Sequence, residues 1–184
     1  MAAVRLSSLT IVLWAAVAGC DGDPGTTEPD AALPTPDAAP VGQGSPPMRD
    51  IAINEVATEP ATGPDWIELV NRGGAAATLD GMFVSDAADR PDHYYQFPAG
   101  TTLAPGAYLL VWADSGDPGA GHHAPFELGQ ADSVVLLGPT GLTVDRLIYL
   151  AQSDGRTLAR VPDHEGLFFA VAPTMGAPNP ETMP

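Results

Sequence analysis

The sequence of 184 residues has no lysine, a single cysteine and few aromatic residues. Its formal net charge is −16, from seven arginines against 23 acidic residues. Nucleic-acid binding requires a basic surface that releases counterions from phosphates, so this charge argues against a nucleic acid as partner. One cysteine excludes an intrachain disulfide, and the fold must therefore depend on core packing.

Motifs of nucleophilic catalysis are also missing. There is no Gly-x-Ser-x-Gly elbow, no lysine for a Schiff base and no glycine-rich phosphate loop ahead of a helix. A Ser153, Asp154 and His164 triad can be written down, but a chain of this length offers such combinations by chance. We therefore expect that the protein is not an enzyme.

The first twenty residues have the organisation of an export signal. Arg5 precedes an apolar run from Leu9 to Ala18, and the small residues Val17-Ala18-Gly19 lead to Cys20. The run of ten residues is too short to span a membrane, which takes roughly 20. The segment resembles the lipobox of bacterial lipoproteins. That resemblance implies cleavage after Gly19 and a diacylglyceryl group on the sulfur of Cys20.

Lipidation at Cys20 would make a membrane the first partner, because two acyl chains suffice for stable anchoring. The expected location is the cell envelope, on the inner or outer membrane and facing the periplasm or the surface. Asp21 resembles the inner-membrane retention signal of enteric lipoproteins, although sorting rules differ between bacterial groups. The alternative is an ordinary cleaved signal with a cysteine near its end. Without residues 1–19 the chain keeps six arginines against 23 acidic residues, a net charge of −17.

Residues 20–50 contain the lipidated cysteine followed by a segment rich in proline and aspartate. This segment has no aromatic residue and little apolar surface to bury, so we expect a disordered linker. Its reach lies between about 30 Å for a flexible coil and about 90 Å for extended polyproline II.

Residues 51–179 have the pattern of one antiparallel all-β domain, followed by a short tail at 180–184. Short apolar runs alternate with turn signals such as Gly138-Pro139-Thr140-Gly141, and we expect that segment to close a hairpin. No window shows helical periodicity with caps at both ends. The predicted strands are 50–56, 65–71, 81–85, 94–97, 107–113, 133–138, 142–149, 157–161 and 167–171.

Six segments in this region suggest a family. They are 51–56 (IAINEV), 65–71 (DWIELVN), 79–86 (LDGMFVSD), 97–101 (FPAGT), 105–113 (PGAYLLVWA) and 173–179 (PTMGAPN). In order and spacing they resemble the bacterial version of the lamin tail domain. The resemblance covers residues 51–179 and implies an immunoglobulin-like antiparallel β-sandwich. It implies no specific activity, because bacterial members look like accessory modules that stand alone or accompany exported enzymes.

Asn54, Glu55, Asp65 and Glu68 are the candidate site residues, since four oxygen donors on two neighbouring strands could bind a hard cation such as calcium. Strand alternation, however, does not place all four on one face. The simpler interpretation gives no metal and no cofactor. In it, Asn54 and Asp65 cap turns while Glu55 and Glu68 lie on a solvated strand face.

Two further groups of polar residues fall in predicted loops. Asp86, Asp89, Asp92 and His93 form an acidic group that we interpret as solvated loop charge. The adjacent pair His122-His123 should point in opposite directions in an extended chain, which disfavours a shared metal.

The sequence thus predicts a lipid-anchored envelope protein that displays one sandwich as a non-catalytic binding or structural module. An envelope polymer or a protein is the expected partner, reached through loops at the end of the sandwich. The alternatives are a cation-dependent module and an accessory subunit of an exported hydrolase. The oligomeric state stays open.

Overall fold

The computed structural model describes residues 47–151 and 155–183. Cys20 and the predicted signal lie outside the described residues, as does most of the predicted linker. Residues 47–50, which the sequence analysis assigned to that linker, form a 3₁₀ helix, and Met48 packs against the domain core. No helix within the described ranges has the length and apolar character needed to cross a membrane.

Twelve strands and two short 3₁₀ helices make up the described part of the chain. In chain order they are η1 (Pro47–Asp50), β1 (Ile51–Ala57), β2 (Asp65–Asn71), β3 (Ala77–Thr78), β4 (Phe83–Ser85), η2 (Pro91–His93), β5 (Tyr95–Gln96), β6 (Thr102–Leu103), β7 (Tyr108–Ala113), β8 (His122–Ala124), β9 (Asp132–Leu137), β10 (Thr143–Tyr149), β11 (Thr157–Val161) and β12 (Leu167–Val171).

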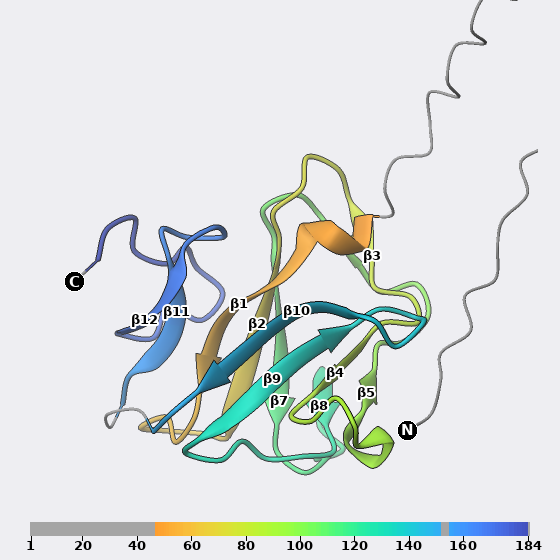
Figure 1. Ribbon diagram of the computed structural model, residues 1–184, viewed down its shortest axis with the longest axis horizontal. Helices are drawn as coiled ribbons and strands as arrows, with labels where there is room; N and C mark the ends of the chain where they lie inside the picture. Colours follow the sequence, from red (N-terminus) through yellow and green to blue (C-terminus); the bar gives the residue numbers. More distant parts are fainter. Residues whose placement is uncertain (1–46, 152–154, 184) are drawn as a thin grey trace, which may run out of the picture. The chain divides into compact units, whose positions relative to one another are not determined.

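The strands form two main sheets that pack face to face. One sheet has six strands in the order β12-β11-β1-β2-β7-β8, and the other has four in the order β10-β9-β4-β5. β3 and β6 make a separate two-stranded ribbon. Figure 1 shows the four-stranded sheet lying over β1, β2 and β7, with β11 and β12 to one side. The all-β prediction is confirmed, and the architecture is an antiparallel β-sandwich.

Apolar side chains from both sheets fill the space between them. Ile67 and Leu69 of β2 are fully buried there, and they meet Val134 and Leu136 of β9 in one continuous core. Strand alternation explains which side chains of each strand enter the core, because every second side chain points to the same face. We call the face of the six-stranded sheet that packs on this core its inner face, and the opposite one its outer face.

Most strand predictions agree with the structure to within two residues at each end, and the hairpin at 138–141 is confirmed. In this hairpin the Gly138 N–H donates to the Leu142 carbonyl at 2.9 Å. The sequence analysis missed three short strands: β3, β6 and β8. β8 lies in a segment that we expected to be a glycine-rich loop, and it pairs in parallel with β7. Each of the three has only two or three residues, too few to show periodicity.

A β-bulge in β1 decides which side chains face the core. The pairing of Ile53 with Leu69 is followed by the pairing of Glu55 with Glu68, so Asn54 is an extra residue in β1. In a regular strand without the bulge Glu55 would share the inner face with Ile53, because side chains of a strand alternate and every second one points the same way. The bulge turns Glu55 to the outer face and returns Val56 to the core.

The backbone beside this bulge is held by a side-chain clamp from two other strands. The Ile53 N–H donates to the Asp145 carboxylate of β10 at 2.9 Å, and the Arg160 guanidinium of β11 donates to the Ile53 carbonyl at 2.7 Å. Arg160 also pairs with Asp145 at 2.9 Å. The clamp therefore satisfies two backbone groups of β1, and it joins β10, an edge strand of the four-stranded sheet, to β1 and β11 of the six-stranded sheet.

Candidate functional site

Three of the four predicted site residues meet on the outer face of β1 and β2. Asn54, Glu55 and Glu68 are all fully buried there, together with the carboxylate of Asp163 from the turn between β11 and β12. We call these four residues the outer-face cluster. The bulge makes this grouping possible, since it directs Asn54 and Glu55 to the same side of β1.

Asp65, the fourth predicted residue, is not part of the cluster. It lies three residues before Glu68 in β2, and an odd separation along a strand points two side chains to opposite faces. Its carboxylate accepts hydrogen bonds from the Glu59 N–H at 2.7 Å and the Leu128 N–H at 3.2 Å. Burial raises the pKa of Asp65. The predicted role of Asp65 as a turn cap is confirmed, and it also ties the loop at Leu128 to β2.

The prediction that Glu55 and Glu68 lie on a solvated strand face is wrong. Both side chains have an exposed fraction of 0%. They are covered by residues 173–179, which follow β12 and make hydrogen bonds to both carboxylates. A pattern of alternating polar and apolar residues cannot distinguish a solvated face from one covered by a distant segment of the chain.

Glu55 accepts three hydrogen bonds from two threonines, Thr174 of the covering segment and Thr157 of β11. Its Oε1 accepts from the Thr157 hydroxyl at 2.5 Å and from the Thr174 N–H at 3.0 Å. Its Oε2 lies 2.6 Å from the Thr174 hydroxyl. Glu55 therefore links β11 and residue 174 to the bulge in β1.

Glu68 binds the covering segment two residues further along. One of its carboxylate oxygens accepts from the Gly176 N–H at 2.5 Å, and the other accepts from the Asn54 amide at 3.1 Å. Burial raises the pKa of Glu68 to about 6, and the nearby carboxylates of Glu55 and Asp163 add to the shift. Two carboxylates directly opposite each other on paired strands repel, and these hydrogen bonds offset the repulsion.

Asn54 connects the carboxylates through its side-chain amide, and its side-chain oxygen and backbone carbonyl also accept hydrogen bonds. Its amide donates to Glu68 and, at 3.1 Å, to Asp163. Its side-chain oxygen accepts from the His164 N–H at 3.3 Å, and its backbone carbonyl accepts from Asn179 at 3.2 Å. We had expected Asn54 to cap a turn. It is instead the centre of a hydrogen-bonded network.

The network extends through Asp163 to a tyrosine and a histidine at its edge. The Tyr108 hydroxyl donates to Asp163 at 2.6 Å, and His164 Nε2 lies 2.9 Å from the same carboxylate. Burial and the neighbouring Asp163 raise the pKa of Tyr108 well above its usual value. Sequence reasoning missed Tyr108, Asp163 and Thr174 as members of this network, because the contacts that join them to it span 55 to 119 residues.

Chemically, the outer-face cluster is a structural network. Every carboxylate in it accepts at least two hydrogen bonds from the protein. Within residues 47–151 and 155–183, no group of three histidine, cysteine, aspartate or glutamate side chains is arranged to hold a metal ion. The arrangement instead holds residues 173–179 on the outer face of the six-stranded sheet.

The two histidines of β8 point to different partners, as predicted. His122 Nδ1 lies 2.8 Å from the Tyr95 hydroxyl, whereas His123 Nδ1 lies 2.7 Å from Asp114. Burial lowers the pKa of His122, and the hydrogen bond to Asp114 raises that of His123. The loop histidine His93 pairs with Asp86 at 2.7 Å, so part of the predicted solvated loop charge is engaged within the fold.

A pocket at one end of the sandwich brings together two arginines, Arg49 and Arg72, that lie 23 residues apart in the sequence. It has a volume of about 580 Å³ and lies between η1, the turn after β2 and the β9–β10 hairpin. Its lining residues are Met48, Arg49, Arg72, Gly138, Pro139, Thr140, Leu142, Thr143 and Val144. The lining includes two arginines and no acidic residue. We call this hollow the end pocket.

The two facing sheets, antiparallel except for the β7–β8 pair, define the protein as a β-sandwich of the immunoglobulin-like class. The family model Lamin Tail Domain matches residues 45–152, more than half of the chain, and the chain belongs to this family. The matched region ends before β11, whereas the sheet continues through β12 to Val171. A comparison with curated proteins found no match to the chain.

Proposed function

We propose that this chain is a lipid-anchored protein of the cell envelope that displays its lamin tail domain as a non-catalytic binding module. The observation that carries the proposal is Cys20, which directly follows an apolar run and the small residues Val17-Ala18-Gly19. A proline-rich segment then connects this cysteine to one folded domain.

The role of the acidic residues supports binding rather than catalysis. The carboxylates that the sequence offered as site candidates accept hydrogen bonds from backbone amides and threonine hydroxyls, and these bonds position the chain. A catalytic acid or base must instead reach a substrate. The end pocket is of the size of a small-ligand site, and it lies among loops at the end of the sandwich.

Fatty-acid labelling of cells that express the full chain tests the anchor. We expect labelling of the wild type, together with a membrane-bound form released only by detergent. Cys20→Ser should remain unlabelled and keep its signal. Equal labelling of the two proteins, or a wild type found wholly in the aqueous fraction, would contradict the proposal.

Thermal unfolding separates a binding module from a cation-dependent one. We expect the same midpoint in calcium, in magnesium and in a chelator, because a ligand that binds only the native state must raise the midpoint. A rise in calcium that a chelator reverses would support the cation-dependent alternative. Chemical crosslinking in intact cells would then identify a polymer or protein partner.

A further inference from the structure

Two arginines, Arg49 and Arg72, line the end pocket. Residues 47–184 contain six arginines and 18 acidic residues, so the domain as a whole is strongly negative. In the described residues, arginine ion pairs join Arg90 to Asp92 and Arg160 to Asp145. Arg49 and Arg72 make no such pair there, and both are exposed. A ligand with an anionic group would complement the positive charge of the end pocket.

The rest of the pocket lining is largely apolar. Met48, Pro139, Leu142 and Val144 line it, and 73% of the Leu142 surface is exposed. Arg72 is held beside this surface by a hydrogen bond of 3.2 Å from its guanidinium to the Arg49 carbonyl. The ligand should therefore combine an anionic group with an apolar part.

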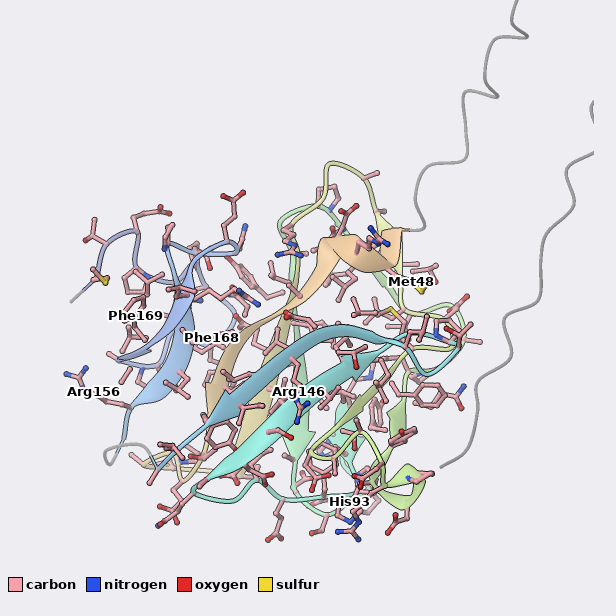
Figure 2. All side chains as sticks on the ribbon, viewed as in Figure 1. Met48, His93, Arg146, Arg156, Phe168 and Phe169 are labelled. Atoms are coloured by element: carbon pink, nitrogen blue, oxygen red, sulfur yellow. The ribbon has the colours of Figure 1, made fainter. Side chains whose placement is uncertain are left out.

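The pocket lies close in sequence to Cys20. This position indicates which ligand with an anionic group and an apolar part the pocket could meet. Met48 and Arg49 belong to η1, the first described element, and residues 21–46 are all that separates it from Cys20. Figure 2 shows Met48 at the end of the sandwich where the described chain begins, while Arg146 and Arg156 lie elsewhere on the domain. If Cys20 is lipidated, the pocket is at the end of the domain that the anchor joins.

We propose that the end pocket binds the phosphate headgroup of an anionic membrane lipid, with Arg49 and Arg72 on the phosphate and Leu142 against the lipid interface. This inference rests on the proposed function, because the anchor is what brings the pocket to a membrane. The acidic remainder of the domain is repelled by the same lipids. Attraction at one end and repulsion elsewhere fix the orientation of the sandwich, with the end pocket toward the bilayer.

Vesicle flotation of a chain of residues 21–184 without Cys20 tests the inference independently of lipidation. This chain contains every described element of the domain. We expect binding to vesicles with phosphatidylglycerol, little binding to pure phosphatidylcholine vesicles, and a loss of binding as salt rises. Each of Arg49→Gln and Arg72→Gln should weaken binding about fivefold, which corresponds to about 1 kcal/mol.

The control is the double variant Arg146→Gln/Arg156→Gln, which removes two charges, one more than either pocket variant, from exposed positions away from the pocket. It should bind like the wild type, and unfolding midpoints should show that all variants are folded. Equal losses in control and pocket variants would overturn the inference, because net charge alone would then govern binding. Binding without a preference for phosphatidylglycerol would overturn it as well.

Inorganic phosphate distinguishes a lipid from a free anion. Millimolar phosphate that abolishes vesicle binding at constant ionic strength would assign the pocket to a soluble phosphate and overturn the lipid assignment. The anchor itself is tested by fatty-acid labelling at Cys20. A labelled protein with an inert end pocket would refute this inference and leave the proposed function standing.

Discussion

The inner and outer faces of β1 and β2 are both buried, but different chemistry buries them. On the inner face Ile67 and Leu69 pack against the second sheet without polar partners. On the outer face Glu55 and Glu68 bind the segment 173–179 through directional hydrogen bonds. Apolar packing tolerates small shifts and is independent of pH, whereas the outer face requires defined partners and depends on protonation.

This difference also separates two parts of the chain. The buried side chains of the core at the inner face all lie within the region that matches the family model, residues 45–152. The outer face is completed by β11, the turn at Asp163 and residues 173–179, which all follow that region. The C-terminal part of the chain thus supplies the partners that make two buried glutamates tolerable in β1 and β2.

The largest effect should come from the inner face. Leu69→Ala removes a fully buried side chain from the core and should lower the free energy of unfolding by about 2–5 kcal/mol. Denaturant unfolding measures this loss. Ile148→Ala, at a side chain that is 66% exposed, is the control and should change the free energy by less than about 0.5 kcal/mol. Similar losses in the two variants would mean that Leu69 is not in a packed core.

The clamp between the two sheets should give the next largest effect. Arg160→Ala leaves the Ile53 carbonyl and the Asp145 carboxylate without their partner, at a cost of about 2–3 kcal/mol. Arg156→Ala removes an exposed arginine that donates one hydrogen bond to the Ala170 carbonyl, and it should cost below about 1 kcal/mol. If the two arginine variants unfold at the same denaturant concentration, Arg160 does not hold the bulge.

The outer face should respond to pH, with a sign opposite to that of an ordinary surface carboxylate. Glu68 has a folded pKa of about 6 against a usual value of 4.5, so the native state binds its proton more tightly than the unfolded chain does. Its stabilising contribution is complete below pH 4.5 and is lost as pH rises through about 6, by roughly 2 kcal/mol.

Comparison with Glu68→Gln isolates this contribution, since glutamine does not titrate. The free energy of unfolding of the wild type, relative to that of the variant, should fall as the pH is raised from 4.5 to above 6. Hydrogen exchange at the Gly176 amide should report the same change locally. A difference between wild type and variant that is independent of pH over this range would show that Glu68 is not desolvated.

Much of the fold followed from local sequence patterns. Short apolar runs bounded by turn residues located β1, β2, β7 and the hairpin β9–β10, because buried strands of this length have that pattern. The spacing of Ile51, Ile53 and Val56 also indicates the bulge, since the interval between these inward-facing residues changes from two to three. That irregularity is the signal in the sequence that would have placed Asn54 and Glu55 on one side of β1.

The partners of the site residues did not follow from the sequence. Glu55 meets Thr174 across 119 residues, and Asn54 meets Asp163 across 109. No local pattern indicates such contacts, because in the sequence each threonine or aspartate is equally compatible with a solvated polar position. For the same reason, no local pattern indicated that Arg49 and Arg72 line one pocket.

The sequence by itself determined an acidic all-β domain of the lamin tail family, because turn residues and apolar alternation act over a few neighbouring positions. Only the tertiary structure decided that both faces of β1 and β2 are buried and that two arginines share a pocket. Those outcomes depend on segments that are far apart in the chain, and their meeting is fixed by packing rather than by local preference.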